Sequence, residues 1–205
     1  MTKSYLFTML IKSRFTSRQK AAKGFTLLEV LVVVLIIGIL AATAGVSWNS
    51  FVNRQRVSAV QNAAQRAIEK AQLEAKSRQL SYSISFKIED NLPKVEFNNS
   101  GLWETLAAGV DIKSGQVLMC TNLSDAKANQ VGTETCDPSN LATARTIQFD
   151  YTGTLPTDTT LPITITFADA GANYSAGEPI VASKRCVRVQ TLLGAITTGM
   201  GSGCP

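Results

Sequence analysis

The chain of 205 residues contains no histidine. Histidine is the usual general base near neutral pH and the most common metal ligand in proteins. Its absence argues against most hydrolytic enzymes and against zinc centres. The sequence therefore predicts a protein that is not an enzyme and that has no cofactor and no metal site.

A second absence is that of charge between residues 30 and 42. With the apolar residues on either side, this run reaches about the 20 residues that a helix needs to span a bilayer. A single acid, Glu29, stands directly in front of the run. The sequence predicts that residues 25–46 form a transmembrane helix. A charged residue such as Glu29 near the start of this helix needs an explanation.

Acidic residues are also missing from residues 1–24, which contain six Lys and Arg. These six exceed the whole excess of the chain's 20 Lys and Arg over its 15 Asp and Glu, so the remainder is nearly neutral. Positive charge on one flank of an apolar helix keeps that flank in the cytoplasm. The rest of the chain is then expected on the exported side of a single-pass inner-membrane protein.

Cysteine is scarce, and all four residues follow the apolar run. They are Cys120, Cys136, Cys186 and Cys204. No pair has the close CxxC spacing of a zinc site, and an exported compartment favours disulfides. Four cysteines allow three connectivities, of which the local one, Cys120 with Cys136 and Cys186 with Cys204, is the simplest. Each such loop would stabilise the fold by about 3 kcal/mol in the chain-entropy model.

Glycine and proline are absent between residues 46 and 79, which are rich in Ala, Gln, Lys, Arg and Glu. Apolar residues recur there every three or four positions: Val57, Val60, Ala64, Ile68, Ala71 and Ala75. This spacing predicts an amphipathic helix. The simplest arrangement is one continuous helix from about residue 25 to 79, roughly 80 Å long, with the transmembrane part followed by a stem at 47–80.

Residues 81–205 predict a β-rich head. Six segments show alternating or β-branched residues bounded by Gly, Asn, Asp or Pro. They are residues 82–88, 94–97, 116–122, 146–151, 162–168 and 185–191. Residues 98–115 and 123–145 have no clear pattern and are expected to be long loops or partial helices.

Two kinds of processing fit the N-terminal region. Residues 42–44, Ala-Thr-Ala, could be the cleavage site of an ordinary secretory signal, which would release a soluble protein. The stretch KGFTLLEVLVVVLIIGIL instead resembles the class III signal of type IV pilins and type II secretion pseudopilins. That resemblance implies cleavage between Gly24 and Phe25 by a prepilin peptidase, which also N-methylates Phe25 and discards residues 1–24 as the leader.

The resemblance also offers a reason for Glu29. A lone carboxylate in a bilayer is costly unless it has a partner. Cleavage creates a cationic amine at Phe25, so Glu29 is expected to pair with the Phe25 amine of a neighbouring subunit during assembly. The alternatives are that Glu29 reaches the membrane surface or caps the start of its own helix.

The stretch ITFADAGANYSAGEPIVASKRCVRVQTLLGAI resembles the GspH/FimT branch of this family. It implies an α+β, pilin-like fold in which the long helix packs on a sandwich-like head. The implied function is that of a minor structural subunit of a type II secretion pseudopilus, with other pilin-like subunits, the peptidase and the membrane as partners. The alternatives are a minor pilin of a type IV pilus and, from another class, a tethered or released binding domain.

Two ligand hypotheses concern this C-terminal third. Some FimT-like proteins bind DNA through an Arg after a glycine, but Ala195 follows Gly194 here, so DNA binding is not expected. Asp169, Asn173 and Glu178 could offer oxygen ligands to calcium. Their spacing does not match a calcium loop, and a solvated turn is the preferred interpretation.

Overall fold

The computed structural model describes residues 24–171 and 181–205. The chain divides into two compact units, Met1–Ala44 and Gly45–Pro205. The helix α1 (Leu27–Arg78, 52 residues) begins in the first unit and ends in the second. It ends where Gln79 takes a left-handed conformation (φ 54°), which stops helical hydrogen bonding. The continuous helix expected from residue 25 to 79 is therefore confirmed.

In the first unit, α1 is apolar and exposed on every side. The exposed fraction is 84% for Leu27 and stays at or above 46% for every large apolar residue as far as Leu40. No face of this segment is covered by other parts of the described chain. Among the described residues, no helix is both long and apolar enough to cross a membrane.

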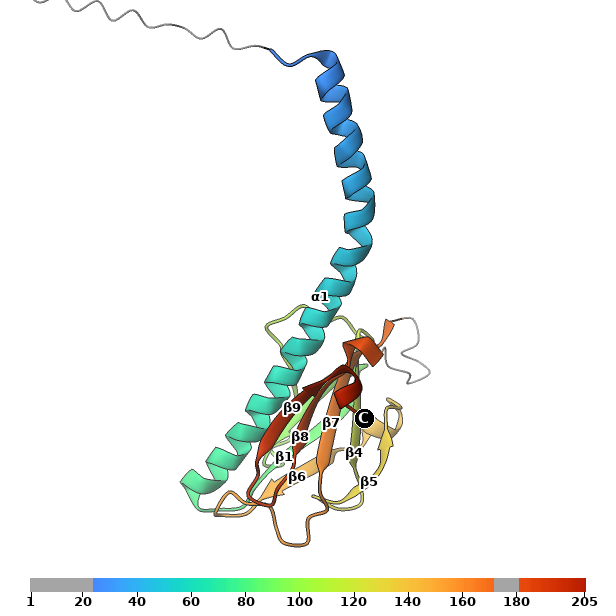
Figure 1. Ribbon diagram of the computed structural model, residues 1–205. Coiled ribbons are helices and arrows are strands. Elements are labelled where there is room, and N and C mark those ends of the chain that lie inside the picture. The colour runs from blue at the N-terminus through green and yellow to red at the C-terminus, as the bar shows by residue number, and fades with distance from the viewer. Residues whose placement is uncertain (1–23, 172–180) are drawn as a thin grey trace, which may run out of the picture. The chain divides into compact units, whose positions relative to one another are not determined.

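The second unit contains two antiparallel sheets (Figure 1). Sheet A has the order β3-β2-β1-β6, with β1 (Tyr82–Glu89), β2 (Leu92–Phe97), β3 (Glu104–Thr105) and β6 (Arg145–Phe149). Sheet B has the order β5-β4-β7-β8-β9, with β4 (Val117–Leu123), β5 (Val131–Thr135), β7 (Ile163–Asp169), β8 (Arg185–Val189) and β9 (Ile196–Met200). Short 3-10 helices lie at Asn140–Ala142 (η1), Val181–Ser183 (η3) and Gly201–Gly203 (η4).

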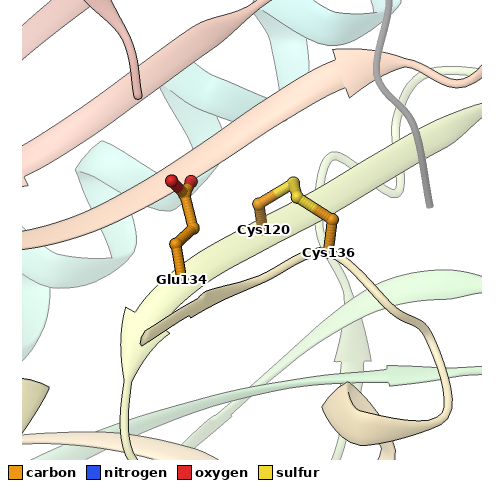
Figure 2. Close-up of side chains that lie close together, drawn as sticks. All are labelled: Cys120, Glu134 and Cys136. Atoms are coloured by element: carbon orange, nitrogen blue, oxygen red, sulfur yellow. A yellow bond between two sulfur atoms is a disulfide. The ribbon is translucent and has the colours of Figure 1, made fainter. Parts of the chain in front are cut away.

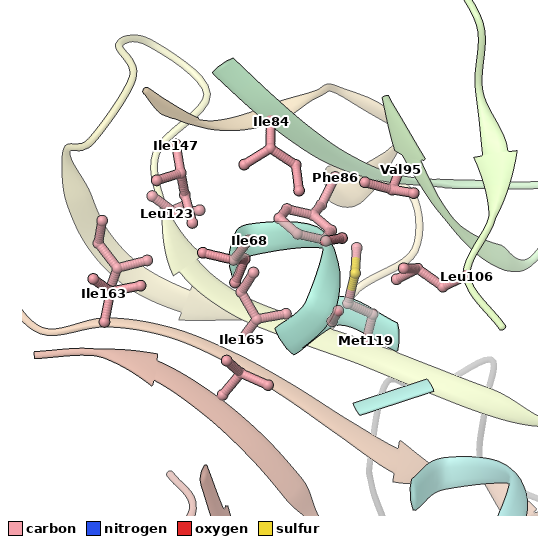
Figure 3. Packing of buried hydrophobic residues seen from close by; sticks show 14 of the residues in the cluster. Ile68, Ile84, Phe86, Val95, Leu106, Met119, Leu123, Ile147, Ile163 and Ile165 are labelled. Carbon is pink, nitrogen blue, oxygen red and sulfur yellow. The ribbon is translucent and has the colours of Figure 1, made fainter. Parts of the chain in front are cut away.

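The apolar stripe of the stem forms part of the core of this unit. All six residues of the expected stripe are at most 1% exposed. Figure 3 shows Ile68 of α1 among Ile84 and Phe86 of sheet A and Ile165 of sheet B. Burying one such side chain stabilises the fold by about 1.5–3 kcal/mol, so the stem and both sheets depend on one another for their core.

Polar side chains of α1 also bind the backbone of the head. Gln61 is 7% exposed, and its Nε2 donates to the carbonyl oxygens of Cys186 (2.9 Å) and Gly199 (3.2 Å). Eleven residues further along, Gln72 Nε2 donates to the carbonyls of Gly153 and Leu193, both at 2.9 Å. These bonds fix the register of the stem against two turns and the β8–β9 pair.

All six strands expected from the sequence are present as β1, β2, β4, β6, β7 and β8. The prediction missed β3 and β5, which lie in the two segments without a clear pattern, and β9. The segment at 98–115 contains β3, and the segment at 123–145 contains β5 and η1. The expected α+β architecture, a long helix on a β-rich head, is confirmed.

Candidate processing and assembly site

The start of α1 is fixed by a local cap. Residues 24–26 are not helical, and α1 begins at Leu27. Oγ1 of Thr26 accepts a hydrogen bond from the backbone N–H of Glu29 at 3.2 Å. This is the arrangement of an N-cap threonine, which satisfies one of the free N–H groups of the first turn. Thr26 was not predicted as a cap, although Thr26 and Glu29 have the Thr-x-x-Glu spacing of a capping box.

The Gly24–Phe25 peptide bond lies just outside the helix. Both residues are exposed, Phe25 by 79%. A Cβ added to Gly24 would meet no atom within 4 Å, and the backbone of Gly24 is not among those with positive φ. Glycine at this position is therefore not required by the packing or the backbone conformation of the described chain. Lys23, which precedes it in the expected signal, lies outside the described residues.

The carboxylate of Glu29 is exposed at the N-terminal end of α1. Glu29 takes part in none of the ion pairs found within residues 24–171 and 181–205. An acid in the first turn interacts favourably with the free N–H groups there, by about 0.3–1 kcal/mol at an exposed site. In the uncut chain the nitrogen of Phe25 is an amide, so it offers Glu29 no charge until the bond to Gly24 is broken.

Two disulfides lie in the head, and both are local. Cys120 is bonded to Cys136, and Cys186 to Cys204. Figure 2 shows Glu134 beside the first pair. These three residues lie close enough to hold a metal ion, but both sulfur atoms are engaged in the disulfide. A thiolate is the form of cysteine that binds metals, so the oxidised pair offers none.

Asp169, which was considered for calcium, and the cations near the end of the C-terminal third have partners within the fold. Asp169 Oδ2 accepts a hydrogen bond from Asn53 Nδ2 at 3.0 Å, which ties the end of β7 to the stem. Asn173 and Glu178 lie outside the described residues. Each of the three cations near β8 donates within the chain: Lys184 to the carbonyl of Pro205, Arg185 to Ser58 and Arg188 to the carbonyl of Gly203.

A comparison with family models finds the prokaryotic N-terminal methylation motif at residues 19–45. The match covers the Gly24–Phe25 bond, Glu29 and the apolar run. Neither the comparison with characterised proteins nor that with solved structures gives a match. This motif, followed by a long helix and a β-rich head of two antiparallel sheets, is consistent with a pilin-like protein. The motif thus agrees with the resemblance to type IV pilins and pseudopilins noted in the sequence.

Proposed function

We propose that this chain is a minor structural subunit of a type II secretion pseudopilus. It has no active site of its own and acts by assembling with other pilin-like subunits through residues 25–46. A prepilin peptidase removes residues 1–24 by cutting between Gly24 and Phe25, and N-methylates Phe25. The single observation that carries the proposal is Glu29 within the methylation motif, in none of the ion pairs of the described residues, at the start of a helix segment of which those residues cover no face.

The assembly step follows from the electrostatics of this helix start. Transfer of an unpaired carboxylate from water into an apolar environment costs several kcal/mol, and more when the site is dry. The amine released at Phe25 is cationic, and N-methylation keeps that charge. A bond between Glu29 of one subunit and the Phe25 amine of its neighbour neutralises both charges, so it favours the assembled state over the separate subunit.

The exposed apolar residues of α1 supply the contact area for the same step. A helix that is apolar all round is stable only when it is covered, by lipid or by other helices. We propose that residues 25–46 are held in the inner membrane before assembly, with the leader in the cytoplasm and the head exported. In the filament, the helices of neighbouring subunits replace the lipid. The disulfides of the head are in keeping with an exported, oxidising location.

The choice of the secretion system depends on the GspH/FimT resemblance of the C-terminal third. The elements behind that resemblance are β7, β8 and the turn at Gly194, where φ is 77° and glycine is the natural residue. A minor pilin of a type IV pilus is the alternative. The neighbouring genes distinguish the two, since a secretion ATPase and its secretin accompany one system and pilus assembly genes the other.

Cross-linking between α1 helices tests the assembly. A cysteine replacing Leu28 in the full-length chain, expressed with its native system, is expected to give disulfide-linked dimers in membranes after mild oxidation. The four native cysteines are paired within the chain, so they are not expected to form cross-links between subunits. The matched control is a cysteine replacing Asn62, which is exposed on the stem. Absence of dimers at position 28 would instead favour a tethered or released domain that does not polymerise.

A further inference from the structure

Two sheets have four edge strands, and three of these edges carry a feature that prevents further strand pairing. An unprotected edge presents free N–H and C=O groups to any other extended chain. Strand β3 is only two residues long. Strand β5 pairs with β4 through a register shift between Thr121 and Leu123, and it carries the charged Glu134. Both features are typical of protected edges.

The edge of β6 is closed by a single side chain. Asn129 Nδ2 donates to the carbonyl of Gln148, and Asn129 Oδ1 accepts from the N–H of Gln148, both at 2.8 Å. The backbone N–H of Asn129 also donates to the carbonyl of Thr146 at 3.1 Å. Asn129 is 3% exposed and adopts a left-handed conformation (φ 61°). It therefore takes the place of a neighbouring strand along β6.

Strand β9 has none of these features. Its five residues, Ile-Thr-Thr-Gly-Met, contain no charge and no proline, and all five pair with β8 in unbroken register. Figure 1 shows β9 as the last strand of sheet B. Thr197 and Thr198 are exposed, and Met200 is 68% exposed.

The register of the β8–β9 pair determines which groups of β9 point outward. The N–H of Gly201 donates to the carbonyl oxygen of Lys184, and the N–H of Gln190 donates to the carbonyl oxygen of Ala195. These bonds mark the two ends of the ladder. Hydrogen-bonded pairs in antiparallel sheets recur at every second residue, so the backbone N–H and C=O groups of Thr197 and Gly199 point towards β8. The N–H and C=O groups of Ile196, Thr198 and Met200 then point away from the sheet, and no described residue is found to bind them.

The side chains of the segment that forms β8 and β9 carry charge of one sign. Residues 181–205 contain Lys184, Arg185 and Arg188 and no Asp or Glu. Thr197, on β9, lies directly opposite Arg188. A chain that adds to β9 would therefore meet a positive field on the adjacent strand, and acidic residues beside the added strand would be favoured over basic ones.

We propose that β9 is a docking edge for an extended segment of a partner protein, flanked by acidic residues, which adds to sheet B as a sixth strand. The alternating N–H and C=O groups of Ile196, Thr198 and Met200 match only another β-strand. Main-chain hydrogen bonds supply the affinity in this mode of recognition, and neighbouring side chains supply the preference among partners. The inference does not depend on which filament system the protein serves.

Hydrogen exchange at single amides tests the docking edge in the full-length protein in detergent micelles. The probe is a peptide of alternating valine and threonine with two glutamates at each end. In the free protein, the amides of Thr197 and Gly199 are expected to exchange slowly and the amide of Thr198 quickly. The peptide should slow exchange at Thr198 at least about tenfold and leave Thr197 unchanged. No change at millimolar peptide would overturn the proposal.

Two further comparisons separate the parts of the proposal. An otherwise identical peptide with lysines in place of the glutamates should bind more weakly, and equal binding overturns the acidic preference. Slow exchange at Thr198 that appears without peptide and grows with protein concentration would assign the edge to a second copy of this chain. That outcome would overturn the assignment to a foreign strand.

A matched pair of variants reports on the backbone group itself. Thr198→Pro removes an outward N–H that the fold does not use, and proline is tolerated on edge strands. Thr198→Val keeps the N–H and a side chain of similar shape. Peptide binding is expected to be lost in the first and retained in the second, with the unchanged β8 amides showing that both variants are folded. Equal binding by both would exclude main-chain pairing at this edge.

Discussion

Glu29 and Thr26 are joined by a hydrogen bond from the backbone N–H of Glu29 to the hydroxyl oxygen of Thr26, 3.2 Å long. The bond uses the main chain of Glu29 and leaves its exposed carboxylate out of every ion pair in the described part of the chain. Capping of the helix uses the backbone of Glu29, whereas the proposed charge pairing between subunits would use its carboxylate. They can be tested with separate substitutions.

Glu29→Gln is expected to lower incorporation into filaments at least about tenfold, because one lost charge pair of 1.4 kcal/mol or more has that effect on an equilibrium. Thr26→Val weakens the cap by about 1 kcal/mol but leaves the charge in place, so its incorporation should stay near that of the native chain. Filament content is measured by immunoblotting of sheared filaments against membranes. Equal incorporation of Glu29→Gln and the native chain would remove the assembly role of the carboxylate.

Gly24→Ala is expected to block removal of the leader without affecting the fold. A Cβ at this position would meet nothing within 4 Å in the described part of the chain, so we expect any loss of cleavage to arise in the complex with the peptidase. Intact mass spectrometry of membrane extracts should give a chain that starts at methylated Phe25 for the native protein and the full-length mass for the variant. A native chain that starts at Gly45 would instead indicate an ordinary signal peptidase.

Gln61→Leu should lower the free energy of unfolding by about 1–3 kcal/mol, because it leaves the buried carbonyls of Cys186 and Gly199 without this donor. Asn62→Ala is the control on the exposed side of the same helix turn, and surface changes of this kind stay within about 0.5 kcal/mol. Urea unfolding followed by circular dichroism measures both. A variant as stable as the control would mean that the two bonds add nothing to attachment of the stem.

Asp150 is expected to make stability dependent on acid pH. Burial raises the pKa of Asp150, but hydrogen bonds from Thr152 and Thr154 outweigh it and lower the pKa from 3.8 to about 2. Because the folded pKa is the lower one, the stabilisation is complete above about pH 4 and is lost as the pH falls towards 2. Asp150→Ala should remove it.

The measurement is the urea midpoint of the native chain and of Asp150→Ala at pH 5 and pH 2.5. The gap between the two proteins should shrink at the lower pH. Other carboxyl groups with lowered pKa values, such as Glu89 and Asp158, titrate in both proteins and cancel in this comparison. A gap that is the same at both pH values would show that the charge of Asp150 does not contribute.

The parts of the fold with a strong local pattern could be predicted from the sequence. The stripe that includes Val60 and Ile68 has helical spacing, and each residue is buried because the stem has one covered face. Strands β1 and β7 show alternation or β-branched residues, and both lie largely in the core: six of the seven residues of β7 are buried. The processing signal around Gly24 and Phe25 could also be predicted from the sequence, because it is a short contiguous motif.

The remaining parts depend on contacts between distant residues. Strand β9 has no alternation of buried and exposed positions to read, and β5 has only Val131 as an apolar residue. The side chains of Gln61 and Asn129 bind backbone groups that lie 19 to 138 positions away in the sequence. Such roles cannot be derived from a local sequence pattern. The disulfide connectivity also depends on which distant residues meet in the fold, so the sequence left three possibilities open.

The paired glutamines of the stem have a mechanical consequence. Gln61 and Gln72 bind the head 11 residues apart, which is about 16 Å along a helix. A tensile force applied along the helix axis would load both attachment points at the same time, together with the buried stripe between them. The stem would then resist in shear, where bonds share the load, rather than by peeling, where they break one after another. A subunit that is pushed or pulled through its helix could therefore transmit force to its head while the head stays folded.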